Sequence, residues 1–586
     1  MAWILFLPVC LVYAWNTLEN HSDFWAHAAV GRWIVNHRQP PTHTLFLWTC
    51  HNPWIAHSWL SEAMMYIMVC RLSDDRAAIA GLLSATAIAF LAFALLWQLY
   101  RVSERTVCPA IILFSIGLCA ASGRFLPRPE MASFVLLAVL LYVLVARQSS
   151  SKEPHPNPLL GKERETTSLP QPLSPPGKGE QRQTDASRAD MRLAALLAAM
   201  FVLWTNLHGG MLAGLIVLWI AALSDLVQER ASRRTVRFAC TAALCTIATL
   251  INPYGWHYYS IYKAVSTVTF THILEWKPVY LEPYVPASTA YSLAILLAAT
   301  LFAWARCPLS VAPHPNPLLG KEREPADTPV TRRWSHLLWL LAFAAMTIQA
   351  RRNVGFLALI CVAVAAPYFQ AWSARLNPAA RASELAPKGR KRPARAKAQP
   401  EADAMRWVWP TATAIVYLVI LVNGYEGMSS GPVRAVIPTI ASGMCSFVKQ
   451  NEISGRLFND YDYGSYLEWR LGPRDHGLYV DGLNAYPDQV FSDYLDILNA
   501  TPRGTQLLDQ QRIDCVMGSA GTAAPVCRYV AASPEWALAY FGHDGPIWVR
   551  RLPQYRSLWE GVPVWQGSTP RDYVQYLHTA ARDEAQ

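Results

Sequence analysis

The sequence predicts a polytopic α-helical membrane protein with about 11 transmembrane helices and a small α/β domain at its C-terminal end. Three observations lead to this prediction. Hydrophobic residues make up 53% of the 586 residues and charged residues only 16%, below the roughly 25% of a soluble domain. The hydrophobic residues form long runs, as in helices that cross a bilayer. Beyond residue 440, short apolar stretches alternate with polar turns instead.

Eleven apolar segments are expected to span the membrane. They lie near residues 3–17, 77–99, 107–121, 131–146, 190–205, 209–226, 236–251, 288–306, 334–350, 354–371 and 407–423. We interpret the first as an uncleaved helix, because no basic residues precede it and no convincing cleavage site follows. The segment 58–71 is short and carries Glu62. It is therefore predicted to lie at the membrane interface.

The basic residues indicate the orientation of these helices. If the N-terminus is cytoplasmic, every second loop faces the cytoplasm, and these loops are rich in Lys and Arg, as the positive-inside rule requires. They are residues 100–106, 147–189, 227–235, 307–333 and 372–406. Because the formal net charge of +10 is spread over these loops, we expect contact with anionic lipid and no nucleic-acid binding.

Three of the cytoplasmic loops are interpreted as insertions. The segment 154–165 recurs without change at 313–324, and both copies are rich in Pro and charged residues. Such segments cannot bury a core. The loops 147–189 and 307–333, together with 372–406, are therefore predicted to be tolerated additions without a catalytic role.

The chain is predicted to divide into a membrane domain, residues 1–424, and an extracytoplasmic α/β domain, residues 425–586. Strands are predicted at 455–460, 477–482, 513–517 and 546–550, with a helix near 493–498. No Cys pair has CxxC spacing and no Cys/His set has metal-ligand spacing. Cys515 and Cys527 could form a disulfide if this domain lies outside the cytoplasm.

Polar residues gather in the first external loop, residues 18–76. Asp23, Trp25 and His27 follow the first apolar segment, and His57 and Glu62 precede the next. Titratable groups at a membrane boundary are costly unless they do chemistry or are paired. Asp23, His57 and Glu62 are candidate catalytic groups, whereas Trp25 and His27 are candidate substrate contacts. The alternatives are a helix cap at Asp23, structural histidines, and an ion pair between Glu62 and a loop arginine.

The other external loops contribute further candidates for substrate binding. These are Arg124, Arg128, Asn252, Glu275, Arg351 and Arg352. Guanidinium groups suit a departing phosphate. The alternatives are an interfacial anchor at Arg351 and Arg352, and a helix-terminating turn at Asn252-Pro253-Tyr254-Gly255.

Taken together, the loop motifs resemble one group of membrane enzymes. The motifs are Asp23-x-Trp25-x-His27 with Gly31, His57-x-Trp59-Leu60-x-Glu62, Arg128-Pro129, Asn252-Pro253-Tyr254-Gly255, Glu275-Trp276, Asn459-Asp460-Tyr461, Gly464 to Leu467 and Val480-Asp481-Gly482. In this order they resemble an uncharacterised bacterial branch of the GT-C superfamily of integral-membrane glycosyltransferases. The superfamily is related to protein O-mannosyltransferases and aminoarabinose transferases. The chain departs from the pattern at Ser58, where many relatives have an acidic residue, and at Leu483, where many have Arg.

This resemblance implies a GT-C-like fold in a bacterial inner membrane. It also implies an inverting transfer of a sugar from a polyprenyl-phosphate donor to a glycan, lipid or protein acceptor outside the cytoplasm. Asp23 would act as base or stabiliser. No cofactor and no metal ligand is firmly implied, although a divalent cation is possible and Asp460 and Asp462 form an Asp-x-Asp pair.

Two other functions fit the same composition. A transporter or lipid flippase would place ionisable groups within its spans and often shows inverted repeats. The apolar segments here carry few charges, and no repeat relates the two halves. A catalytically inactive GT-C-like scaffold remains an alternative because of Ser58 and Leu483.

Overall fold

A computed structural model describes most of the chain. The described residues are 22–100, 106–150, 178–228, 232–262, 274–278, 287–306, 333–376, 411, 414, 441–473, 477–483, 485–519, 524–567 and 570–580. The predicted first helix at 3–17, both copies of the repeat, the boundary near residue 424 and nearly all of the predicted last span lie outside the described residues.

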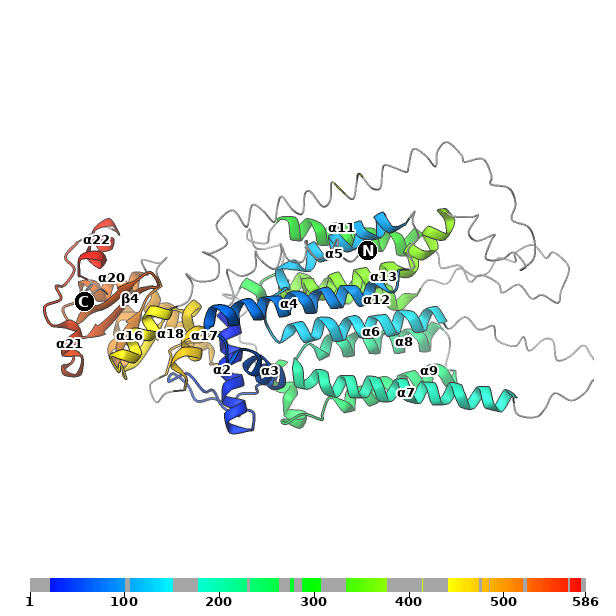
Figure 1. The fold of residues 1–586 in the computed structure, drawn as a ribbon, viewed down its shortest axis with the longest axis horizontal. Coiled ribbons are helices and arrows are strands. Elements are labelled where there is room, and N and C mark those ends of the chain that lie inside the picture. Colours follow the sequence, from blue (N-terminus) through cyan, green and yellow to red (C-terminus); the bar gives the residue numbers. More distant parts are fainter. Residues whose placement is uncertain are drawn as a thin grey trace, which may run out of the picture.

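Nine of the predicted spans are helices that lie side by side in an elongated bundle (Figure 1). They are α4 (Asp74–Trp97), α5 (Val107–Ala121), α6 (Glu130–Ser150), α7 (Lys178–Leu207), α8 (Met211–Gln228), α9 (Arg233–Ala248), α11 (Ala287–Arg306), α12 (Trp334–Gln349) and α13 (Val354–Leu376). Among the described residues, seven helices are long and apolar enough to cross a membrane. The helices α9 and α12 have 16 residues each and are shorter than such a span. The described part of the chain thus shows a multi-pass membrane domain.

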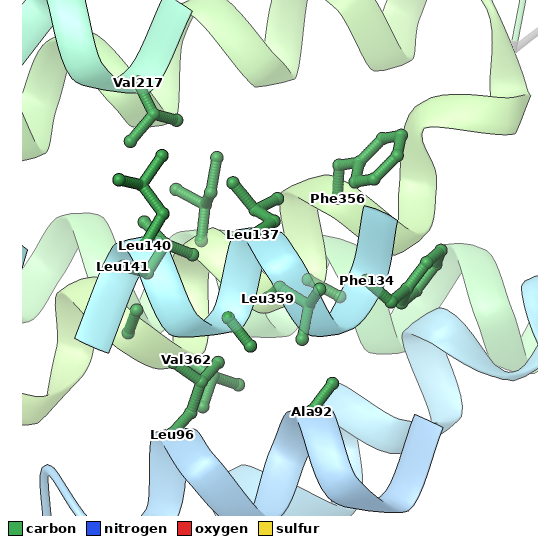
Figure 2. Close-up of a cluster of buried hydrophobic side chains, with 14 of the residues drawn as sticks. Ala92, Leu96, Phe134, Leu137, Leu140, Leu141, Val217, Phe356, Leu359 and Val362 are labelled. Carbon is green, nitrogen blue, oxygen red and sulfur yellow. The ribbon is translucent and has the colours of Figure 1, made fainter. Parts of the chain in front are cut away.

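The centre of the bundle lies where α6 and α13 pack together and meet α4 and α8. Leu137, Leu140 and Leu141 of α6 and Leu359 and Val362 of α13 are fully buried there (Figure 2). Because lipid is as apolar as these side chains, close packing rather than hydrophobic transfer stabilises such a contact. This core holds the ends of α5, α6, α8 and α13 in fixed positions.

Two short helices lie between the bundle and the C-terminal domain (Figure 1). They are α2 (Ser22–His37) and α3 (Trp59–Val69). With 11 residues α3 is too short to cross a bilayer, and its Met64 and Ile67 side chains are 58% and 64% exposed. These features agree with the interfacial helix predicted for 58–71.

The C-terminal domain contains a four-stranded sheet and surrounding helices. Its elements are α16 (Ser442–Gln450), β1 (Arg456–Asn459), η7 (Tyr461–Tyr463), α17 (Gly464–Leu471), α18 (Asp488–Leu498), α19 (Pro502–Gln510), β2 (Ile513–Met517), α20 (Pro525–Ala532), β3 (Trp536–Gly542), β4 (Gly545–Arg550), η8 (Pro553–Tyr555), α21 (Arg556–Trp559) and α22 (Pro570–Ala580). The strand order is β1-β2-β4-β3, with β1 and β2 parallel and the other pairs antiparallel. The predicted α/β fold of this region is confirmed.

One strand prediction for this domain is wrong. Residues 477–482 form no strand; Leu478 makes a single bridge to Leu47 of the first loop. The Asn459 side chain accepts a hydrogen bond from the Tyr479 N–H (2.9 Å) and donates one to the Val480 carbonyl (3.0 Å). These backbone groups are therefore satisfied by a side chain rather than by a neighbouring strand. The structure also decides the disulfide that the sequence left open: Cys515 and Cys527 are buried free thiols in β2 and α20.

The C-terminal domain docks on the bundle through α17. The ring of Trp25 on α2 lies 5.4 Å from that of Tyr466 and 5.8 Å from that of Trp469. Asp74, in the first turn of α4, accepts hydrogen bonds from the Tyr466 hydroxyl (2.6 Å) and Arg470 (3.1 Å). The contact joins both domains beside the polar residues of the first loop.

Candidate functional site

The first part of the site is formed by the starts of α2 and α3. Asp23 lies in the first turn of α2, where the helix dipole favours a negative charge, and His27 follows one turn later on the same face. The Nδ1 atom of His27 lies 3.0 Å from Oε1 of Glu62, which is buried in the first turn of α3. The structure therefore brings together three of the predicted residues, and Glu62 pairs with a histidine rather than with an arginine.

The close packing of these two helices depends on Gly31. A Cβ atom at this position would lie 2.0 Å from the Glu62 carbonyl oxygen and 2.9 Å from the Tyr66 Cβ atom. Only glycine therefore fits between α2 and α3 at this point. The glycine noted in the first-loop motif thus has a packing role that fixes the relative positions of His27 and Glu62.

A second part of the site is a chain of ion pairs that links distant loops. Arg128 contacts both Asp23 (Nη2 to Oδ2, 2.9 Å) and Glu275 (Nη1 to Oε1, 2.7 Å). Arg124 contacts Glu275 (2.7 Å) and also Glu130. Burial alone would lower the pKa of Arg128, but Asp23 and Glu275 raise it. Burial would likewise raise the pKa of Glu275, but Arg128 and Arg124 hold it well below its usual value. Arg128 and Glu275 thus stabilise the charged form of each other.

Arg352 differs from these arginines in its contacts. It lies in η6 (Arg351–Asn353), and its guanidinium stacks on the Trp276 ring at 4.2 Å from the ring centroid. The side chain is partly exposed, and within the described part of the chain no hydrogen bond or ion pair joins it to a carboxylate. The neighbouring Arg351 donates its backbone N–H to the Lys277 carbonyl (3.1 Å). Arg352 is thus a cation whose N–H groups remain available to a ligand.

Two histidines line the same region as neutral groups. The rings of His57 and His208 lie 6.0 Å apart between their centroids. Burial, followed by the charges of His27 and Arg352, lowers the pKa of His57 to about 4. Burial also lowers the pKa of His208 well below its usual value. The Gly210 N–H donates to Nδ1 of His208 (2.9 Å), so that nitrogen is an acceptor and the ring proton lies on Nε2.

Two predicted substrate contacts, Trp25 and Asn252, contribute to the packing of the fold. Trp25 is 4% exposed and lies in the hydrophobic contact between α2 and α17. The side chain of Asn252 receives the Tyr254 N–H (2.8 Å) and donates to the Gly255 carbonyl (3.2 Å). This is the helix-terminating turn that the sequence left open as an alternative.

An apolar pocket of about 560 Å³ lies next to this turn. It is formed between α3, the end of α7 and the residues that follow α9, and its rim carries the hydrogen bond from Trp59 Nε1 to Asn206 Oδ1 (2.9 Å). The lining residues are Trp59, Leu60, Ala199, Val202, Leu203, Asn206, Ile251 and Asn252. The pocket is close to His57 in the chain and suits an apolar ligand.

Sequence reasoning missed several polar residues near Asp23. Glu130 contributes to the ion pairs, and Ser465, Glu468 and Asp481 of the C-terminal domain are buried around Asp23. The only sequence signal for these three was their position within the motifs 464–467 and 480–482, or next to one. Among the described residues, no group of three His, Cys, Asp or Glu side chains could hold a metal ion, and this includes Asp460 and Asp462.

Comparison with known proteins gives matches among solved structures. The oligosaccharyltransferase AglB from Archaeoglobus fulgidus, in complex with an inhibitory peptide and a dolichol-phosphate, is 10% identical with a TM-score of 0.48, covering 87% of this chain and 69% of that one. ArnT from Cupriavidus metallidurans in the apo state is 12% identical with a TM-score of 0.47, and the match covers 95% of this chain and 98% of that one. ArnT bound to undecaprenyl phosphate is 13% identical with a TM-score of 0.41, and the match covers 94% of this chain and 98% of that one. No family model and no curated protein matches the chain.

AglB and ArnT are both membrane glycosyltransferases of the GT-C superfamily, the group that the loop motifs resemble. All of these TM-scores lie below 0.5. The roles of individual residues therefore depend on the contacts in this chain alone.

Proposed function

We propose that this protein is a membrane glycosyltransferase that transfers a sugar from a polyprenyl-phosphate donor to an acceptor on the extracytoplasmic side. The observation that carries the proposal is the position of Asp23 and Arg352. A carboxylate and an arginine that contacts no carboxylate of the described residues both belong to one cluster of charged side chains, at the end of the bundle that meets the C-terminal domain. Sugar transfer from a phosphate needs both kinds of group.

Arg352 is proposed to contact the donor phosphate. Arg124 and Arg128 already contact Glu130, Glu275 and Asp23 through both of their terminal Nη atoms. The contact with the Trp276 ring restricts the Arg352 guanidinium, which leaves it suited to a bidentate contact with a phosphate. His57 and His208 are neutral and add no competing charge.

The apolar pocket is proposed to receive part of the isoprenoid chain. Its walls are mainly Leu, Val, Ala and Ile side chains from α3, α7 and the end of α9. A chain bound there would lie against helices of the bundle, so the donor would enter sideways from the bilayer. Because a chain that enters from the bilayer is already in an apolar environment, close packing against these walls, rather than hydrophobic transfer, would hold the donor at the site.

Asp23 is proposed to act on the acceptor. Its side chain is 25% exposed, and its Oδ2 atom is held by Arg128 while Oδ1 lies near Gly482. In the proposed inverting reaction the acceptor oxygen attacks the anomeric carbon and its proton moves to Asp23. The bond between that carbon and the phosphate oxygen breaks, and the electron pair leaves with the phosphate beside Arg352.

The test is turnover of a panel of polyprenyl-phosphate sugars by the purified protein and by Asp23→Asn. We expect donor binding to be retained and transfer to fall by about 10²- to 10⁴-fold, the usual contribution of a general base. Asp75→Asn is the matched control, because Asp75 is an exposed carboxylate in the first turn of α4. Full transfer by Asp23→Asn would disprove the assigned role. Donor binding without turnover in all three proteins would favour an inactive scaffold.

A further inference from the structure

Four buried acidic or hydroxyl side chains surround the contact between α17 and α2. Glu468 is 1% exposed, Asp481 and Glu62 are each 2% exposed, and Ser465 is 0% exposed. Burying a carboxylate is costly unless a cation, a hydrogen-bond donor or a proton compensates its charge. The partners of each group therefore show which form of compensation is present.

Among the described residues, the carboxyl group of Glu468 has no cation and no N–H donor as a partner. Neither of its two oxygens accepts a hydrogen bond from an N–H or O–H group of the described residues. The guanidinium of Arg32 donates to the backbone carbonyls of Trp469 (2.8 Å) and Glu468 (3.4 Å) instead of to the carboxylate. Glu468 thus differs from Asp23 and Glu62, which are paired with Arg128 and His27.

The other charged groups around Glu468 do not neutralise it. The elements packed around α17 contribute Asp23, His27 and Arg32 of α2, Glu62 of α3, Asp462 of η7, Lys449 of α16 and Arg470 of α17 itself, and Asp481 lies in the following loop. Arg470 contacts Asp74. Burial, followed by the charges of Asp481, Asp23 and Glu62, raises the pKa of Glu468 well above its usual value.

The loop that contains Asp481 also lies against Asp23. Gly482 follows Asp481, and a Cβ atom at this glycine would lie 2.5 Å from Ser465 Oγ and 3.1 Å from Asp23 Oδ1. The Leu483 N–H also donates to Asp481 Oδ1 (3.1 Å) and closes the turn. The backbone of residues 481–483 therefore connects the buried acids to the carboxylate proposed to act on the acceptor.

We propose that Glu468 and Asp481 share one proton, and that this acid pair holds the loop of residues 481–483 against Asp23. With the proton present, one carboxyl donates a hydrogen bond to the other and the buried pair carries a single negative charge. Without it, two buried carboxylates repel each other and the loop moves away from Asp23. Glu468 is a positioning residue in this scheme, and its effect on sugar transfer rests on the function proposed above.

The first experiment detects the proton directly in the full-length protein. Infrared spectroscopy at pH 7 should show the C=O band of a protonated carboxylic acid, with its shift in D₂O, and Glu468→Gln should remove it. Glu452→Gln, the same change at an exposed glutamate of this domain, should leave the band unchanged. Asp481→Asn removes the repelling charge, so the band should then disappear at a lower pH than in the wild type. A band that survives Glu468→Gln and Asp481→Asn unchanged would overturn the proposal.

The second experiment follows thermal unfolding from about pH 5 to pH 8. Because the folded state holds a proton that the unfolded state releases, stability should fall as pH rises above the pKa of unfolded glutamate, by up to tenfold in the folding equilibrium constant per pH unit. The Glu468→Gln variant carries no such proton. Its unfolding midpoint should therefore exceed that of the wild type, and the difference between the two midpoints should grow as the pH rises. An increase of the wild-type midpoint by Mg²⁺ or Mn²⁺ that Glu468→Gln abolishes would show a bound cation instead, and would overturn the shared proton.

The third experiment measures how sugar transfer depends on pH, and so tests whether the Glu468–Asp481 pair affects it. Wild-type turnover should decline at alkaline pH, whereas turnover by Glu468→Gln should persist there. If both proteins transfer with the same pH profile, the positioning role is wrong even when the infrared band is present. If neither protein transfers any sugar, the proposed function fails, and the band and the unfolding curves still decide whether the proton exists.

Discussion

Three arginines lie at the end of the bundle that faces the C-terminal domain, and their partners separate their roles. Arg124 and Arg128 hold the loops together through Glu130, Glu275 and Asp23. Arg352 stacks on an aromatic ring and is available to a ligand. Arginines in neighbouring loops thus have different roles: those beside carboxylates hold the structure together, and Arg352 is left to bind a ligand.

This division predicts different outcomes for two substitutions to glutamine. Arg352→Gln should weaken donor binding by about 2 kcal/mol, or roughly thirtyfold, because it removes charged hydrogen bonds to the phosphate. Arg124→Gln should mainly lower the thermal unfolding midpoint, because it leaves the buried Glu130 without its arginine partner. Donor titration and thermal unfolding of both variants separate the two effects. Equal donor affinity in wild type and Arg352→Gln would contradict the phosphate contact.

The sequence predicted the members of the charged cluster except Glu130, but it did not predict how they pair. Asp23, Arg128 and Glu275 were identified because each lies in a loop on the same predicted side of the membrane. Their contacts join residues more than 100 positions apart, and only the packing of α5, α6 and α13 brings these loop ends together. Glu468 was missed because nothing in its local sequence marks it as buried.

Among the elements, the α2–α3 pair carries the clearest prediction. Gly31→Ala places a Cβ atom 2.0 Å from a backbone oxygen of α3, so the helices must separate. We expect a loss of about 1–3 kcal/mol in stability, typical of overpacking, and a marked loss of transfer, because His27 and Glu62 move apart. Thermal unfolding and turnover are the measurements. Gly123→Ala is the control, because nothing lies within 4 Å of a Cβ atom there, and an equal effect of both changes would refute the packing role.

Strand prediction in the C-terminal domain succeeded where pairing is regular. β1, β2 and β4 were expected from short apolar runs and are present. β3, whose sequence Trp536–Gly542 is equally apolar, was missed although it forms a hairpin with β4. The segment 477–482 has the composition of a strand, but the side chain of Asn459 satisfies its backbone groups. Composition alone cannot distinguish a side-chain partner from a strand partner.

For the whole molecule, the alternation of loops predicted from charge agrees with the spatial arrangement. Loops expected on one side, carrying Asp23, Arg128 and Glu275, meet in a single cluster. Residues at the opposite ends of the helices form a separate network, in which Arg147 contacts Asp225 at 2.7 Å. The C-terminal domain docks on the first of these ends and supplies Ser465, Glu468 and Asp481. The candidate site is therefore complete only when both domains are in contact.

That dependence predicts the effect of loosening the contact at Asp74. This carboxylate accepts hydrogen bonds from the Tyr466 hydroxyl (2.6 Å), Trp469 Nε1 (3.2 Å) and Arg470 (3.1 Å). Asp74→Ala removes all three, at a cost of about 2 kcal/mol or more for a charged acceptor. Hydrogen exchange of the α17 amides should accelerate roughly thirtyfold as the domain separates from the bundle more often, and sugar transfer should fall with it.

Asp75→Ala is the matched control for this experiment. Asp75 shares the first turn of α4 and is exposed, so both changes lose the same favourable interaction with the helix dipole. The difference between the two variants then isolates the contacts to α17. Equal exchange rates would mean that the rings of Trp25, Tyr466 and Trp469 hold the domain without Asp74. Faster exchange of α17 with unchanged transfer would mean that sugar transfer does not require the C-terminal domain to stay docked, and would remove Ser465, Glu468 and Asp481 from the site.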